Sequence, residues 1–214
     1  MGNKVFFDSQ KIMKLISEEG LFNFLLKTKK YIRDNIYGIR KAFVFELDLE
    51  KKYPKVNTDF RLSFRLASED DIESMDEKHY DYNGKSKNYS KQRLKKGDKC
   101  ILAINNDKII GYMWVMNNQM ELAENKYQSL NEDMSYTYKG FVLEQYRGNR
   151  VLSAMYKYLI DMLKKEGKHL IITAADLDNK SSIKALERLC FKKIGILYHI
   201  KFFGLNKDFI KNNI

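Results

Sequence analysis

Two arginines and a glycine stand directly before a predicted helix in the segment EQYRGNRVLSAM, residues 144–155. The first turn of a helix leaves backbone N–H groups unpaired, and their summed dipoles favour anions. Gly148 lets the backbone approach a ligand without a Cβ, while Arg147 and Arg150 add full positive charge. Neither a Walker loop nor a dinucleotide G-x-G-x-x-G motif is present. Two interpretations follow, a pyrophosphate or polyphosphate site and a solvated basic helix turn.

The charge distribution points in the same direction as this segment. The net charge is +11, and residues 141–214 contain 14 basic and 7 acidic side chains. A basic region attracts anions such as nucleic acid or a phosphorylated cofactor, although a lysine-rich composition explains the total charge equally well. A nucleic-acid binder needs aromatic residues interleaved with Lys and Arg on an exposed sheet. The segment YHIKFF offers this, but Phe202 and Phe203 fit a core strand as well.

The composition favours one soluble globular domain with a small N-terminal extension. The chain has 214 residues, of which 44% are hydrophobic, and no run of 18 apolar residues that would predict a membrane span. The start MGNKVFFDSQ lacks the pattern of a signal peptide. Cys100 and Cys190 have neither metal-ligand spacing nor a disulfide pattern. We therefore expect a reduced, cytoplasmic protein without a metal.

The first 58 residues differ in pattern from the rest. Residues 9–42 have apolar positions at helical spacing, and residues 43–50 alternate as a strand. Pro54, the only proline, lies in a predicted linker. The sequence thus predicts an extension of helix and strand over residues 1–58 and a main domain over residues 59–214.

The main domain is predicted as an α/β protein, an α+β arrangement with a mixed sheet. Alternating residues predict early strands, and later segments contain a β-α-β unit. Asn105, Asn106 and Asp107 form a predicted turn, Ser68 a predicted N-cap, and residues 117–133 a polar loop. The predicted strands are 60–67, 99–105, 108–116, 134–143, 168–175 and one or two within 191–204; the predicted helices begin after Ser68 and cover 89–95, 151–166 and 180–189.

Several segments resemble the GNAT superfamily of N-acetyltransferases. QYRGNRVLSAM is similar to its motif A, in which Tyr146, Arg147 and Gly148 match, whereas Arg150 and Leu152 replace small residues. FRLASEDDI and KCILAINNDKIIGYMWV resemble the opening strand, helix and hairpin of the family. NKSSIKALERLCFKKIG resembles its closing motif, with matches at Asn179, Ser182, Leu189 and Phe191 and with Cys190 in place of glycine. The resemblance spans roughly residues 59–203.

This resemblance implies a GNAT-like acyl-CoA N-acyltransferase fold that binds acetyl-CoA where a bulge separates two parallel strands. The strand ending at Leu143 would pair with the pantetheine arm, and the following loop would hold the pyrophosphate. Asn179 would contact the pantetheine side and also cap its helix. The implied cofactor-binding residues are Phe141, Val142, Leu143, Arg147, Gly148, Asn149, Arg150, Val151, Leu152, Ser153, Asn179 and Ser182.

The implied activity is transfer of the acetyl group to a primary amine, with a small molecule as the expected acceptor. The Val142 amide would stabilise the oxyanion. Many relatives use a tyrosine as the acid, but Leu186 occupies that position. We therefore consider Tyr198 as the acid and Glu144 as the base. Other candidates are Tyr136, Tyr138, His199, Glu121 and His79, although each of these residue types is more often structural.

Two alternatives within this resemblance stay open. One is a catalytically silent domain that binds acyl-CoA or a protein partner, and the other is a GNAT-like aminoacyl transferase that uses charged tRNA. In the main interpretation the partners are acetyl-CoA and an amine, with no membrane or nucleic acid. A homodimer is left open.

Overall fold

The computed structural model describes residues 17, 37–58, 60–75, 87–123, 126–202 and 205–212. The chain divides into two compact units. Residues 1–40 and 198–208 form the smaller unit, and residues 41–197 and 209–214 form the larger one. Both hydrophobic clusters of the described core belong to the larger unit.

One mixed sheet organises the strands. The strands are β1 (Tyr37–Asp48), β2 (Ser63–Leu66), β3 (Lys99–Asn105), β4 (Lys108–Asn117), β5 (Gln119–Ala123), β6 (Lys126–Ser129), β7 (Met134–Val142), β8 (Leu170–Asp176), β9 (Lys192–Phe202) and β10 (Leu205–Asn212). Eight of them follow the order β10-β9-β1-β8-β7-β4-β3-β2, while β5 and β6 form a separate hairpin. β7 and β8 are parallel, whereas β8 pairs antiparallel with β1 and β7 pairs antiparallel with β4.

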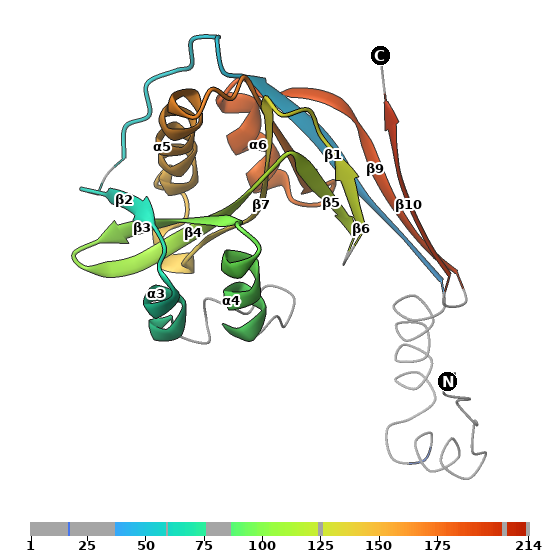
Figure 1. Cartoon of the computed structure of the whole chain (residues 1–214), viewed down its shortest axis with the longest axis horizontal. Coiled ribbons are helices and arrows are strands. Elements are labelled where there is room, and N and C mark those ends of the chain that lie inside the picture. Colours follow the sequence, from blue (N-terminus) through green and yellow to red (C-terminus); the bar gives the residue numbers. More distant parts are fainter. Residues whose placement is uncertain are drawn as a thin grey trace. The chain divides into compact units, whose positions relative to one another are not determined.

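Helices cover both faces of this sheet (Figure 1). They are α3 (Glu69–Ser74), α4 (Lys87–Lys95), α5 (Val151–Lys165) and α6 (Lys180–Arg188). In Figure 1, α5 and α6 lie on one face and α3 and α4 on the other. Met155 and Leu159 of α5 are fully buried in one hydrophobic cluster, and Ile72 of α3 is buried in the second. The sheet thus separates two cores.

The residue pattern of β3 explains why it lies between these cores. Ile101 and Ala103 belong to the cluster under α5, whereas Cys100 and Leu102 belong to the cluster under α3. Successive side chains of a strand point to opposite faces, so a run of apolar residues covers both. β3 is therefore packed on both of its faces.

Short-range sequence signals predicted the local structure correctly at two positions. Asn106 and Asp107 form the two-residue turn between β3 and β4. Their φ values are 47° and 61°, a positive range that Asn and Asp tolerate well. The Ser68 hydroxyl accepts a bond from the Asp71 amide, and the Asp71 carboxylate accepts one from the Ser68 amide. This reciprocal capping box begins α3 as predicted.

The N-terminal prediction differs from the structure in one respect. Residues 37–42, predicted as helix, belong to β1, whose residues from Ala42 onward pair with β8. Tertiary pairing in a sheet overrides a weak helical pattern. Of residues 9–36 the structure describes Ser17 alone, which is helical, so the rest of the predicted helix lies outside the described residues. The division at residue 58 stays a prediction.

Two other segments form strands that were not predicted. Residues 117–133, predicted as a loop, contain the hairpin of β5 and β6, which is anchored by the buried Met120. β10 follows the last predicted strand. Within the described residues, no helix has the length and apolar character needed to span a bilayer.

Candidate functional site

The parallel strands β7 and β8 pair only over their first residues. Their register runs from Met134 opposite Leu170 to Thr137 opposite Thr173. Beyond this point β8 continues along β1, and β7 continues along β4. β7 contains one extra residue there, because Tyr138 faces Trp114 while Phe141 faces Tyr112. The carboxyl ends of the two strands are thus paired to different neighbours.

A β-bulge at Lys139 accompanies this separation. Lys139 has a φ of 49°, the left-handed conformation that a bulge residue often adopts. On the facing strand, a Cβ added to Gly111 would lie 2.7 Å from the Phe141 carbonyl oxygen. Only glycine therefore allows β4 to approach the bulged part of β7 this closely.

Buried hydroxyl groups occupy the last parallel pair. The Tyr156 hydroxyl lies 3.1 Å from Thr137 Oγ1 and donates to Thr173 Oγ1 at 3.4 Å, while Thr173 Oγ1 donates to the Thr137 carbonyl at 3.1 Å. Burial raises the pKa of Tyr156, which keeps the phenol neutral at pH 7. We call these three side chains the apex cluster.

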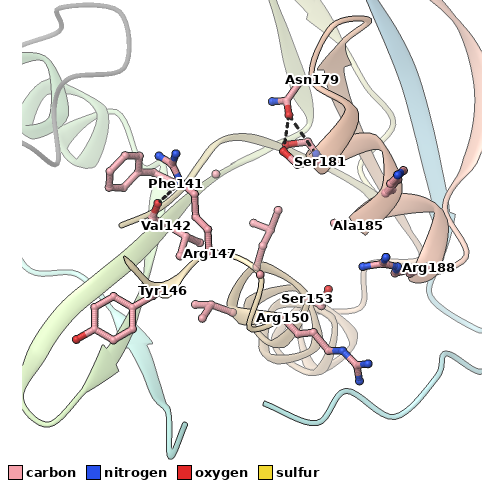
Figure 2. Close-up of a pocket in the computed structure, with 16 residues that line it drawn as sticks. Phe141, Val142, Tyr146, Arg147, Arg150, Ser153, Asn179, Ser181, Ala185 and Arg188 are labelled. Atoms are coloured by element: carbon pink, nitrogen blue, oxygen red, sulfur yellow. Dashed lines mark hydrogen bonds between the residues drawn. The ribbon is translucent and has the colours of Figure 1, made fainter. Parts of the chain in front are cut away.

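A pocket of ≈ 470 Å³ lies at the separated ends of the strands. Its wall comes from the end of β7, the loop before α5, the first turn of α5 and the exposed face of α6 (Figure 2). The lining residues are Gly140, Phe141, Val142, Tyr146, Arg147, Gly148, Arg150, Val151, Leu152, Ser153, Asn179, Ser181, Ser182, Lys184, Ala185 and Arg188. Ten of the twelve predicted cofactor-binding residues and a face of α6 thus meet in one cavity.

The loop before α5 leaves the first turn of this helix open. Gly148 has a φ of 83°, and Arg150, the N-cap residue, has a left-handed φ of 59°. No side chain caps this helix, so the amides of its first turn are available to an anion. A left-handed conformation costs a non-glycine residue roughly 1–2 kcal/mol. Glycine would therefore fit the backbone of position 150 better than arginine does.

Asn149 and Arg147 hold the loop in this shape. Asn149 Nδ2 donates to the Arg147 carbonyl at 3.1 Å, and Arg147 Nε donates to the Val142 carbonyl at 3.0 Å. Figure 2 shows the second bond as a dashed line at the side of the pocket. Asn149 does not line the pocket. Its side chain therefore stabilises the loop, and the neighbouring residues are the ones that can contact a ligand.

Asn179 begins α6, as predicted, and also lines the pocket. Its Oδ1 accepts bonds from the Ser182 amide at 3.1 Å and from Ser181 Oγ at 3.0 Å (Figure 2). Its Nδ2 has no partner among the described residues. The cap therefore uses the acceptor of Asn179, and the amide donor is available to a carbonyl group.

The predicted cofactor-binding residues mostly come together in this pocket. The residues that line it include Phe141, Val142, Ser182 and, with the exception of Asn149, the positions from Arg147 to Ser153. Leu143 does not line it, and the Leu143 amide donates to the Ile110 carbonyl at 2.9 Å. β7 ends at Val142, so its last residues offer a ligand Phe141 and Val142.

The two predicted catalytic residues do not line the pocket. Glu144 is exposed on the short helical turn η3 (Glu144–Tyr146), and Tyr198 is half-buried on β9. Leu186 is 3% exposed and packs in the core, so this position provides no acid. The roles of Tyr198 and Glu144 stay predictions.

The other candidate acids and bases have structural partners. Tyr138 donates to Asp98 at 2.6 Å, Glu121 pairs with Arg93 at 2.6 Å, and His199 Nδ1 lies 2.8 Å from Asp208. Burial raises the pKa of Tyr136 and Tyr138. His79 lies outside the described residues.

Positive charge on α6 is the feature that was missed. Lys184 and Arg188 line the pocket, together with Gly140, Tyr146, Ser181 and Ala185. The N-cap at Asn179 was predicted correctly, and helical spacing from it would have placed Lys184 and Arg188 on one face. No cluster of three or more His, Cys, Asp or Glu side chains suited to a metal ion occurs in the part of the chain that the structure describes.

Comparisons with known proteins agree with this fold. A GCN5-related N-acetyltransferase from Sphaerobacter thermophilus is 10% identical with a TM-score of 0.58, covering 97% of this chain and 71% of that one. A Drosophila protein is 13% identical with a TM-score of 0.55, covering 85% of this chain and 58% of that one. A Staphylococcus epidermidis protein of unknown function is 14% identical with a TM-score of 0.53, covering 90% and 68%. These likenesses show a shared fold, and the chain spans only 58% of the Drosophila protein.

The sequence itself also matches a known family. No curated protein matches the chain at a significant level. Residues 58–191, more than half of the chain, match the family described as Acetyltransferase (GNAT) family. They include the separated strands, the loop before α5 and all of α6. The chain therefore belongs to the GNAT acetyltransferase family.

Proposed function

We propose that this chain transfers an acetyl group from acetyl-CoA to a primary amine of a small molecule. The observation that carries the proposal is the pocket at the separated ends of β7 and β8, which combines an uncapped helix N-terminus with four cationic side chains. Such a site favours a ligand with several phosphate groups. Membership of the acetyltransferase family supports acyl transfer as the reaction.

The walls of the pocket offer different groups to different parts of acetyl-CoA. The main chain of Phe141 and Val142 would pair with the pantetheine arm, and Asn179 Nδ2 would donate to one of its carbonyl groups. The backbone from Gly148 to Ser153 and the guanidinium of Arg147 would hold the pyrophosphate. This assignment is supported by the open first turn of α5.

Acetyl-CoA supplies a thioester carbonyl that an amine can attack. The Val142 amide would donate to the carbonyl oxygen as negative charge develops there. The pocket holds the donor in one orientation, which makes attack by a neighbouring amine effectively intramolecular. The acceptor must lose a proton, and the predicted residues for proton transfer are Glu144 as base and Tyr198 as acid.

Isothermal titration calorimetry with CoA and a thiol-release assay test this proposal. We expect CoA to bind the full chain, and free thiol to appear from acetyl-CoA only when an accepted amine is added. A panel of small primary amines, with peptides as a second group, identifies the acceptor class. Absence of CoA binding in calorimetry would falsify the proposed function.

A catalytically silent acyl-CoA-binding domain is the second candidate. The observation that favours it is Leu186, which is apolar and buried where the resemblance to relatives expects a tyrosine acid. A silent domain binds CoA in calorimetry but releases no thiol with any amine. The two assays therefore separate the two candidates.

A further inference from the structure

Helix α6 contributes two cations to the pocket wall. Lys184 and Arg188 are one turn apart and both line the pocket, as does Arg150 from the loop. Residues at i and i+4 lie on the same face of a helix. In the view of Figure 2, Arg150 and Arg188 lie on one side of the pocket, opposite Tyr146 and Arg147.

Among the described residues, these three cations have no acidic partner. The lining residues include no Asp or Glu. The side chains of Arg150, Lys184 and Arg188 form no ion pair or hydrogen bond with another residue of the described ranges. The acid of the same helix, Glu187, is used elsewhere, because it pairs with Lys193 at 2.7 Å. Like charges one helical turn apart repel each other, so a multivalent anion would relieve this repulsion.

The donors of α6 differ from those at the start of α5, where Arg150 is the N-cap residue. Helix α5 offers backbone amides, and Arg147 is already oriented by its bond to the Val142 carbonyl. Lys184 lies in the middle of α6 and Arg188 in its last turn, where backbone amides are used within the helix. Lys184 and Arg188 therefore offer charged side chains to the pocket, and such groups suit a terminal phosphate with its full charge.

We propose that Arg150, Lys184 and Arg188 form a second anion subsite, which binds the 3′-phosphate of CoA separately from its pyrophosphate. This inference rests on the proposed function, since it takes CoA as the ligand. A phosphate monoester carries a charge of about −1.5 to −2 at pH 7. Arginine can bind two of its oxygens at once, while lysine acts as a point charge. The subsite makes the chain selective for the 3′-phosphorylated carrier.

Calorimetry with CoA and 3′-dephospho-CoA isolates this phosphate. The two ligands share the pantetheine arm and the pyrophosphate, so their affinity ratio reports the subsite alone. We expect the wild-type chain to prefer CoA by about tenfold or more, the scale of a charge-assisted hydrogen bond. Arg188→Gln and Lys184→Gln should each reduce this ratio several-fold while leaving affinity for dephospho-CoA nearly unchanged.

Matched variants make the result specific. Arg61→Gln removes the same charge from an exposed residue away from the pocket, and it should leave the ratio as in wild type. Arg188→Lys should recover part of the preference, because it restores the charge. Lys184 lies away from the end of α6, so Lys184→Gln does not alter the helix end as Arg188→Gln does. Circular dichroism of both variants would reveal any effect on folding.

Three results overturn the inference. One is a wild-type ratio near one. Another is an equal loss of affinity for both ligands in Arg188→Gln, which would assign this residue to a shared part of the ligand. The third is an unchanged ratio in both Arg188→Gln and Lys184→Gln. Failure of both ligands to bind wild type would instead contradict the proposed function itself.

Discussion

The Tyr156 hydroxyl lies 3.1 Å from Thr137 Oγ1, at the last residue pair before β7 and β8 separate. Tyr156 comes from α5, the helix whose first turn lines the pocket. One side chain therefore connects the start of the strand separation to the helix that bears the anion-binding loop. The apex cluster fixes the position of α5 against the parallel pair through hydrogen bonds as well as packing.

Tyr156→Phe should destabilise the fold by about 1 kcal/mol, because it leaves a buried threonine hydroxyl with one partner fewer. Urea denaturation measures this change as a lower midpoint at an unchanged slope. Tyr158→Phe on the same helix is the matched control, since the half-buried Tyr158 hydroxyl has no hydrogen-bond partner among the described residues. An equal change in both variants would show that the apex cluster contributes no more than packing.

Acid should weaken the fold partly through Asp71. Arg65 Nη2 donates to Asp71 Oδ1 at 2.6 Å, and this bond lowers the pKa of the carboxyl group, with help from Ser68. The stability from a lowered pKa is fully present above the unfolded value of about 3.9 and is lost as pH falls through the folded value. Arg65 is half-exposed, so the contribution is at most about 1 kcal/mol.

Urea denaturation at pH 6 and pH 3 tests this effect. Wild type should lose more free energy of unfolding between these values than Asp71→Asn, which lacks the titrating group. Asp70→Asn removes an exposed carboxylate of the same helix turn and should behave as wild type does. Identical pH dependence of wild type and Asp71→Asn would remove Asp71 from the acid response.

Cys190→Gly should stabilise the protein by roughly 0.5–1 kcal/mol, despite the greater freedom of glycine in the unfolded chain. Cys190 follows the end of α6 with a φ of 67°, the left-handed conformation that glycine adopts without strain. Its amide donates to the Glu187 carbonyl, and the Phe191 amide donates to the Leu186 carbonyl, which is the Schellman pattern. The thiol is exposed, so its removal costs little packing.

Thermal unfolding measures this gain as a higher Tm. Cys190→Ala is the control, because it removes the thiol and keeps the Cβ that causes the strain. Alanine should therefore give no gain. If alanine and glycine raise the Tm equally, the thiol and not the backbone conformation is responsible.

Local signals predicted much of the site because they act over a few residues. The caps at Ser68 and Asn179 and the start of α5 follow from hydrogen-bonding rules that neighbouring residues satisfy. The apex cluster could not be predicted, because Thr137, Tyr156 and Thr173 meet only after α5 packs on the sheet. Its members are ordinary strand and helix residues with no spacing that marks them.

The polar hairpin of β5 and β6 was missed for a related reason. Most of its side chains are exposed or half-buried, and Met120 is the one that is fully buried among its described residues. A single buried residue does not produce the alternation of apolar and polar residues that predicts a strand. Likewise, the left-handed φ of Arg150 contradicts the preference of arginine, so the residue type did not predict it.

Arg150 has two opposing effects, which substitutions can separate. Its left-handed backbone costs stability, whereas its charge lies in the pocket wall. Arg150→Gly should raise the free energy of unfolding by about 1 kcal/mol, since glycine removes the strain. The same change should weaken CoA binding, because one cation is lost. Urea denaturation and calorimetry on one preparation measure both quantities.

Arg150→Glu reverses the charge and keeps the backbone strain. It should leave stability near wild type and weaken CoA binding by about 1–3 kcal/mol, the range for a charged hydrogen bond. Arg150→Lys keeps both charge and strain, so it should stay close to wild type in both measurements. Unchanged CoA affinity in the glycine and glutamate variants would mean that the side chain points to solvent. The open amides of α5 would then bind the phosphates without Arg150.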